Sequence, residues 1–341
     1  MNLHTRTPDI ENLYRVFRRE SPARPTLFEL FLNEPLYQRL AGRKAKPGDL
    51  FDELLLRVEA FAAAGYDYTS THASRIEFKT GDRGHGAKTI SLNRGFVITD
   101  EASFEAYTWP DPASYDCSHL KKIAPLLPGN MKLMIMGPGG VLENAIALVG
   151  YENLCFMLHD NEPLAKAVFD RIGSCLVKYY EIAAQHEAVG FLMSNDDWGF
   201  NTQLFLSPAD MRKYVFPWHK RIAEVSHHSG KPIALHSCGN LEQVMDDVID
   251  DIGFDAKHSF EDTILPIESA YDRYGNRIAL LGGIDLDFII RSDDKTVADR
   301  CRAMLERASA RGGYALGTGN SVPEYVPQDK YLNMIRVALE G

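Results

Sequence analysis

A histidine and a cysteine stand two residues apart at the end of a short apolar run, Pro232-Ile233-Ala234-Leu235-His236-Ser237-Cys238. Gly230 and Gly239 bound this run, a pattern that predicts a buried parallel strand. Alternate residues of a strand point to the same side, so the imidazole and the thiol can converge on one point. Neutral imidazole and thiolate are ligands that suit zinc. The alternative is a core histidine beside an inert buried cysteine.

The composition, with 45% hydrophobic and 25% charged residues, is that of an ordinary globular chain. The 341 residues carry a formal net charge of -10, which argues against a nucleic-acid surface. The five cysteines are odd in number and widely scattered, so they do not form a disulfide framework and favour a reducing, cytoplasmic location. The sequence has neither an apolar run of about 18 residues, as a membrane span needs, nor the apolar core of a signal peptide.

Strand-like and helix-like segments alternate along the chain. The predicted strands are residues 25–32, 66–72, 132–136, 190–195, 232–237, 254–259, 278–284 and 314–318. Eight apolar strands separated by helices predict an α/β fold, the closed (β/α)₈ TIM barrel. An open doubly wound sheet is the competitor, disfavoured because no Gly-x-Gly-x-x-Gly follows the first strand.

We expect one domain over residues 1–341, with two additions to the barrel. Residues 1–23 carry one amphipathic segment, 10–19, and form a helical arm or lid. Residues 75–115 are the least regular stretch, with several glycines and an alternating segment at 104–109. They predict a long loop and hairpin, and loops of that length tend to be functional lids.

Polar and ionisable side chains recur where the predicted strands end. In a (β/α)₈ barrel these ends carry the active site. The residues are Glu29, Asn33, Thr71, His72, Asn195, Asp196, Asp197, His236, Cys238, His258, Glu261, Asp285 and Asn320. Helix capping is an alternative role for Asp285, because Asp is a favoured N-cap. Capping does not account for the histidines or the cysteine.

Two adjacent acids, Asp196 and Asp197, are the second signal of a site. They repel each other unless they are hydrogen-bonded, bound to a cation or sharing a proton. One of them is therefore a candidate general acid, metal ligand or substrate acceptor; the alternative is a loop in which one acid faces solvent. Trp198 beside them could wall a planar or cationic ligand, or pack in the core.

Together these motifs resemble the uroporphyrinogen decarboxylase superfamily, which holds porphyrin decarboxylases and zinc-dependent methyltransferases acting on methylcobamides and thiols. The resemblance covers most of the chain from Pro25 onward and rests on the order and spacing of several segments. These are Met136-Gly137-Pro138, Asp196-Asp197-Trp198-Gly199 followed by Leu206-Ser207-Pro208, His236-Ser237-Cys238-Gly239-Asn240, Leu281-Gly282-Gly283-Ile284-Asp285, and Leu316-Gly317-Thr318-Gly319-Asn320 with Pro323 and Pro327. It implies a (β/α)₈ barrel, in agreement with the strand count.

The resemblance is closer to the methyltransferases than to the decarboxylases. The decarboxylases carry an arginine-rich segment of the type Met-Arg-Gln-Ala-Gly-Arg, whereas residues 28–34 here hold two acids and no arginine, and the decarboxylases' late histidine appears as Thr318. A polyanionic porphyrinogen would meet repulsion there. His236 and Cys238 match the methyltransferases' His-x-Cys zinc pair, but their second cysteine is missing from Gly319-Asn320-Ser321.

The resemblance implies a methyltransferase that moves a methyl group between a small methylated substrate or corrinoid carrier and a metal-activated acceptor. A catalytic zinc needs three protein ligands and an open position. With His236 and Cys238 as two ligands, we expect the third to be His258, with other candidates Glu261, Glu29 and Asp196. Proton handling and substrate positioning are expected from Asp196, Asp197 and Glu261. Substrate contacts are expected from Glu29, His72, Trp198, Asp285 and Asn320.

Two other functions stay open at this point. One is a metal-free lyase that decarboxylates a porphyrin-like or other carboxylate substrate. The other is a non-catalytic protein that holds a tetrapyrrole or corrinoid in the barrel mouth. A corrinoid protein, bringing the corrinoid as its own cofactor, and a second copy of the chain are the expected partners.

Overall fold

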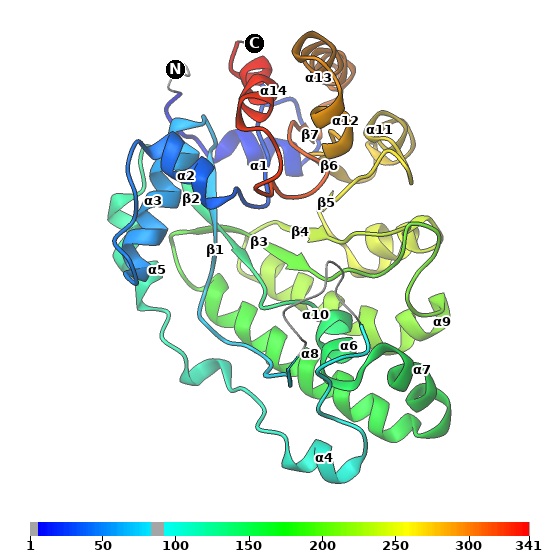
Figure 1. The fold of residues 1–341 in the computed structure, drawn as a ribbon. Helices are drawn as coiled ribbons and strands as arrows, with labels where there is room; N and C mark the ends of the chain where they lie inside the picture. The colour runs from blue at the N-terminus through cyan, green and yellow to red at the C-terminus, as the bar shows by residue number, and fades with distance from the viewer. Residues whose placement is uncertain (1–5, 83–91, 341) are drawn as a thin grey trace.

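Seven parallel strands form one curved sheet in chain order in the computed structural model, which describes residues 6–82 and 92–340 (Figure 1). They are β1 (Tyr68–His72), β2 (Lys132–Met136), β3 (Val189–Asn195), β4 (Ile233–His236), β5 (Ala256–His258), β6 (Ala279–Leu281) and β7 (Tyr314–Ala315). The predicted α/β architecture of parallel strands linked by helices is confirmed. Because all the strands run the same way, their carboxyl ends share one edge of the sheet.

The predicted strand over residues 25–32 is not a regular strand, and that prediction was wrong. Leu27 forms an isolated bridge with Leu316, just beyond β7. On the other side, the backbone amide of Glu29 donates to the hydroxyl of Tyr68, which replaces the backbone ladder with β1. The segment therefore spans the gap between β7 and β1, but with side-chain contacts that periodicity does not reveal.

Helices connect the strands and pack around the sheet. The first group is α1 (Glu11–Phe17), α2 (Glu34–Ala41), α3 (Leu50–Ala63), α4 (Glu101–Ala106), η1 (Pro112–Ser114), α5 (Ser118–Ile123), η2 (Ala124–Leu126), α6 (Val141–Val149), α7 (Tyr151–Asp160) and α8 (Glu162–Ala184). The second is α9 (Pro208–Asp210), η3 (Met211–Val215), α10 (Phe216–His228), η4 (Glu242–Val244), η5 (Asp247–Ile252), α11 (Ile267–Tyr274), α12 (Leu286–Arg291), α13 (Asp294–Ser309) and α14 (Gln328–Glu340).

The N-terminal helical arm is confirmed, and it lies at the end of the barrel opposite to the carboxyl ends of the strands. The Tyr14 hydroxyl of α1 donates to the carbonyl of Gly190, near the start of β3. The ring of Phe17 lies 5.2 Å from that of Phe191. Helix α1 therefore covers the amino ends of the strands and is no lid over their carboxyl ends.

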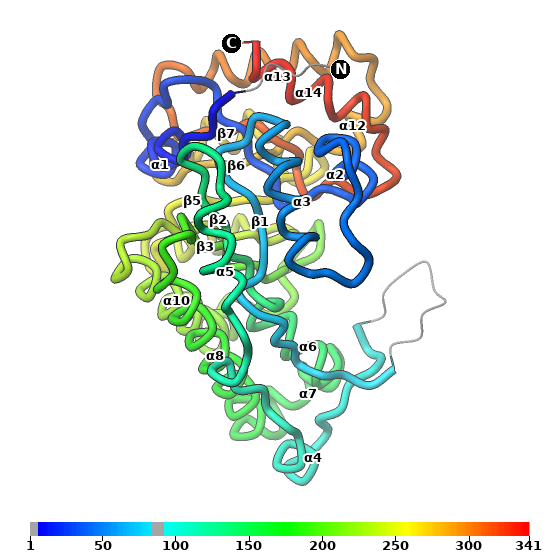
Figure 2. The backbone as a smooth tube through the Cα atoms, turned by 90° about the vertical axis from the view of Figure 1, so that its left-hand side faces the viewer, coloured from blue at the N-terminus to red at the C-terminus, as the bar shows by residue number. Residues whose placement is uncertain are grey.

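The predicted hairpin in residues 75–115 is absent from the part of this insertion that the structure describes. Residues 83–91, which hold part of its glycine-rich run, lie outside the described residues. The alternating segment 104–109 begins inside helix α4, whose N-cap Asp100 exchanges hydrogen bonds with Ser103. This capping box overrides the period-two pattern. In both views α4 lies at the end of the molecule farthest from α13 and α14 (Figure 1, Figure 2).

Among the described residues, no single helix is long and apolar enough to cross a membrane. Helices α6 and α7 pass that test only as a pair, and they bend by 94° at the break between them.

Glu29 is buried where the irregular segment meets the chain after β7. The Thr318 hydroxyl donates to one carboxylate oxygen of Glu29 at 2.6 Å, and the Thr318 amide donates to the other at 3.3 Å. Burial raises the pKa of Glu29 to about 8, so the folded protein holds this carboxyl largely protonated at neutral pH. The structure thus places Glu29, an expected substrate contact, in the core.

Glu29→Gln is expected to reduce the pH dependence of the free energy of unfolding. The folded carboxyl keeps its proton up to about pH 8, whereas the unfolded chain loses it near 4.5. The folded state binds more protons in this window, so stability is highest at low pH and falls as the pH rises.

Between about pH 5.5 and 7.5, the wild type should lose about 1 kcal/mol per pH unit more than Glu29→Gln. Urea unfolding at three pH values measures this difference. Glu34→Gln is the control, because Glu34 is exposed and accepts a hydrogen bond from the exposed end of Gln38. Equal slopes for wild type and Glu29→Gln would contradict the assignment.

Candidate metal centre

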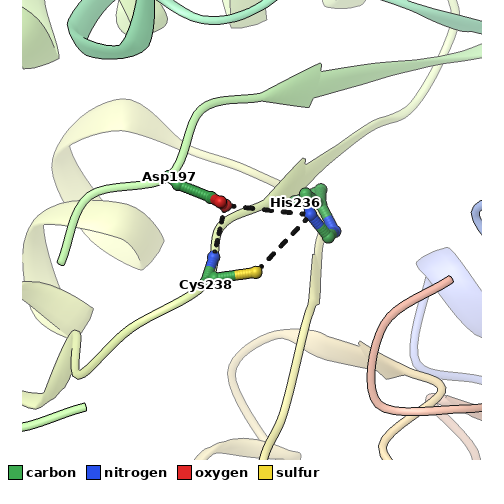
Figure 3. A group of neighbouring side chains, drawn as sticks. All are labelled: Asp197, His236 and Cys238. Atoms are coloured by element: carbon green, nitrogen blue, oxygen red, sulfur yellow. Dashed lines mark hydrogen bonds and ion pairs between the residues drawn. The ribbon is translucent and has the colours of Figure 1, made fainter. Parts of the chain in front are cut away.

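Three donor atoms converge at the carboxyl ends of β3 and β4 (Figure 3). His236 is the last residue of β4, and its Nε2 lies 3.8 Å from Cys238 Sγ and 3.8 Å from Asp197 Oδ1. The Cys238 backbone amide donates to the same carboxylate oxygen at 2.8 Å. All three donor atoms lie within 4.8 Å of one another.

This donor set fits a metal ion such as zinc. With zinc bonds of about 2.0–2.3 Å, tetrahedral ligand atoms lie about 3.3–3.7 Å apart, so the observed spacing needs only a small inward movement. The Asp197 side chain is 37% exposed, which leaves an approach for a further ligand. The sequence analysis expects His258 to be the third ligand. In the structure, Asp197 provides the third donor atom instead.

His258 instead orients His236. Its Nε2 faces the carbonyl oxygen of Thr318 at 3.3 Å, which can only accept, so Nε2 carries the proton. Burial lowers the pKa of His258 well below its usual value, so the ring is neutral and its Nδ1 is an acceptor. His236 Nδ1 lies 2.8 Å away and must donate to it. The neutral His236 ring therefore directs an unprotonated Nε2 at Cys238 and Asp197.

The sulfur of Cys238 is held by two polar neighbours. The Asn320 side-chain amide donates to Sγ at 3.2 Å, and the Ser259 hydroxyl oxygen lies 3.7 Å from it. Burial, followed by the charge of Asp197, raises the pKa of the Cys238 thiol to about 12. A cation at the centre would reverse this effect by favouring the thiolate. Asn320 stands where the resemblance calls for a second cysteine, and it contacts the first one.

Asp196 faces away from the three donors. Its oxygens accept the backbone amides of Leu142 and Glu143, at 3.0 and 2.9 Å, and one of them lies 2.8 Å from His219 Nε2. The side chain is fully buried and holds the start of α6 to the end of β3. A Cβ on Gly140 would lie 2.0 Å from Asp196 atoms, which explains the glycine at that position.

Three other expected contacts also lie apart from the three donors. Trp198 is fully buried, with its ring 5.1 Å from that of His219, so the structure favours packing, the alternative role. Asp285 caps α12 by accepting the Phe288 amide at 3.1 Å. His72 ends β1 and lines a separate cleft of about 940 Å³.

Two acidic groups lie near Asp197, and the sequence reasoning missed one of them. Glu143 lies in the first turn of α6, and burial, then Asp196 and Asp197, raises its pKa. Its only sequence signal is the capping-box spacing from Gly140. Glu261, which was expected, is partly buried, and burial raises its pKa as well.

Lys257 is the other missed residue, a charged side chain within a buried strand. It is 4% exposed, and burial lowers its pKa to about 8, so it remains charged at neutral pH. Its ammonium donates to the carbonyl of Ser259 at 2.5 Å. A lysine inside a predicted strand, between Ala256 and His258, was the available signal.

The comparisons with known proteins agree on the family. The sequence model for uroporphyrinogen decarboxylase (URO-D) matches residues 94–340. This chain belongs to the uroporphyrinogen decarboxylase family. Uroporphyrinogen decarboxylases of Anaeromyxobacter sp. (strain Fw109-5) and Anaeromyxobacter dehalogenans (strain 2CP-C) are 23% and 24% identical to it over 289 residues, covering 82% of this chain and 76% of theirs.

A solved structure with a similar fold carries a different activity in its name. A methyltransferase from Methanosarcina mazei matches with a TM-score of 0.73 at 14% identity, covering 96% of this chain and 97% of that one. At this identity the likeness concerns the fold of the family and not its reaction.

The two adjacent aspartates are expected to respond in opposite ways to the same substitution. Asp197→Asn should weaken zinc binding by about 100-fold and change stability little, because it removes a charged donor at a partly exposed position. Asp196→Asn should keep zinc affinity but lower the free energy of unfolding by about 2–4 kcal/mol, because it disturbs a buried, fully bonded carboxylate. Chelator competition and urea unfolding measure the two effects. Equal loss of zinc affinity in both variants would contradict this geometry.

His258→Phe is expected to lower zinc affinity by about 10–100-fold, because the His236 Nδ1–H loses the acceptor that orients the ring. His258→Gln keeps an oxygen acceptor and should recover part of the affinity. Chelator competition is again the readout, with circular dichroism to confirm folding. An unchanged affinity in a folded Phe variant would show that His258 does not orient the ligand.

Proposed function

We propose that this protein is a methyltransferase that works with a zinc ion held by Asp197, His236 and Cys238. The observation that carries the proposal is the convergence of a carboxylate oxygen, an imidazole nitrogen and a thiol sulfur at the carboxyl ends of β3 and β4. The active site of such a fold lies at this edge. The methyltransferase among the solved structures that share the fold adds support.

The segment that would meet a polyanionic substrate argues against porphyrinogen as the substrate. Residues 28–34 contain two acids and no arginine. Glu29 within this segment is buried and bonded to Thr318. No cation in this segment is therefore available to neutralise substrate carboxylates.

Bound zinc would supply Lewis acidity, which favours the anionic form of an acceptor such as a thiol. His236 offers a neutral nitrogen, while Asp197 and the Cys238 thiolate balance the charge of the ion. The Asn320 amide keeps a hydrogen bond on the sulfur. We assign Glu261 the role of taking up the proton that the acceptor thiol loses, because burial raises the pKa of this carboxyl, which lies near Asp197. The methyl group would come from a small methylated substrate or a corrinoid, the latter brought by a partner protein.

A carboxy-lyase is the second candidate, because both curated relatives are named uroporphyrinogen decarboxylases. Such a reaction would need no contribution from the three donor atoms. It therefore predicts an activity that survives loss of the Cys238 thiol.

The deciding experiment incubates zinc-loaded protein with methylcobalamin and 2-mercaptoethanol and follows the methylcobalamin absorbance. We expect demethylation that falls by about 100-fold or more in Cys238→Ser and in Asp197→Asn. Uroporphyrinogen is offered in parallel, with product chromatography. Decarboxylation at an equal rate in wild type and Cys238→Ser would establish the lyase. Cobalamin binding with neither activity would establish a carrier.

A further inference from the structure

We propose that a small cavity beside the metal centre binds the carboxylate group of an organic acid. This inference deepens the proposed function: if methyl transfer is the reaction, the small substrate or acceptor carries a carboxylate. Binding of the acid itself does not depend on that reaction.

The cavity lies between the chain that follows β4 and the chain that follows β5. Its volume is about 30 Å³, about the space of one small polar group. Its apolar lining includes Leu241, Met245 and Phe260, and its polar lining includes Lys257 and Tyr274. A site of this kind suits a ligand with an apolar body and one polar head group.

Within the described residues the Lys257 ammonium forms no ion pair with a carboxylate, although Asp197 and Glu261 favour its charged form from a longer distance. Its ammonium meets the carbonyl oxygens of Ser259 and Ser237, at 2.5 and 3.5 Å, and lies 4.2 Å from the centre of the Phe260 ring. In the described part of the chain, no acidic oxygen lies within 4.0 Å of it, whereas other lysines such as Lys166 and Lys220 form ion pairs. A buried ammonium whose hydrogen bonds go to carbonyl oxygens would be stabilised by an additional, anionic partner.

Tyr274 supplies an independent observation at the same cavity. The residue is 5% exposed, and its hydroxyl has no hydrogen-bond partner in the part of the chain that the structure describes. Buried hydroxyls are bonded in most proteins, so this one calls for a partner. A carboxylate only accepts hydrogen bonds, and it can accept from both an ammonium and a phenol. A purely structural role for Lys257 would explain its carbonyl contacts but not the unpartnered Tyr274 hydroxyl.

The cavity and the metal centre share Ser259. Its carbonyl accepts from Lys257, and its hydroxyl lies 3.7 Å from Cys238 Sγ. An acid anchored at Lys257 would therefore lie next to a residue that contacts the centre. Glu242 and Glu261 also line the cavity, so they would disfavour a second negative charge on the ligand and select a monocarboxylate.

Calorimetric titration of chelator-treated protein with propionate, propionamide and propylammonium tests this inference without zinc or methyl transfer. We expect propionate to bind at least about tenfold more tightly than the other two probes. Tyr274→Phe should weaken propionate binding by about tenfold without lowering the thermal midpoint, because the hydroxyl forms no hydrogen bond with the described residues. Lys257→Met should abolish binding; should it fail to fold, Tyr274→Phe decides alone.

Tyr325→Phe is the matched control, because this tyrosine is 70% exposed and does not line the cavity; its affinity for propionate should match that of the wild type. Equal affinities for propionate and propionamide, or an unchanged affinity in Tyr274→Phe, would overturn the inference. Propionate binding in a protein without methyl transfer would refute the proposed function and leave the carboxylate site standing.

Discussion

The hydrogen bond between His236 and His258 is the constraint on which the candidate centre depends. Burial makes both rings neutral, and the Thr318 carbonyl decides which nitrogen of His258 carries the proton. Because His258 Nδ1 is then an acceptor, His236 Nδ1, 2.8 Å away, must carry the proton. His236 Nε2 is therefore unprotonated where it faces Cys238 and Asp197. The barrel thus sets the state of a metal ligand through one backbone carbonyl at the end of the sheet.

Asp196 and Asp197, which directly follow β3, have different roles. Asp196 is buried and ties α6 to the sheet through backbone amides, and His219 holds its other side. Asp197 is partly exposed and lies against the Cys238 amide and the His236 ring. The first carboxylate supports the loop that presents the second. A substitution of Asp196 therefore acts mainly on the stability of the fold, whereas a substitution of Asp197 acts mainly on the metal centre.

Much of this arrangement could be predicted from the sequence, because strand periodicity places His236 and Cys238 on one side of the chain. Which of two adjacent aspartates joins them depends on the path of the loop after β3, and periodicity carries no information on that path. The orienting role of His258 depends on a carbonyl from the distant residue Thr318. In the same way, the segment 25–32 has a strand-like sequence but pairs through the Tyr68 side chain, a tertiary contact that overrides local preference.

X-ray absorption spectroscopy of the zinc-loaded protein tests the central claim most directly. An Asp197, His236 and Cys238 site predicts one Zn–S distance of about 2.3 Å and otherwise nitrogen and oxygen neighbours at about 2.0–2.2 Å. A spectrum without a sulfur neighbour, or with two of them, would contradict the assignment of the centre.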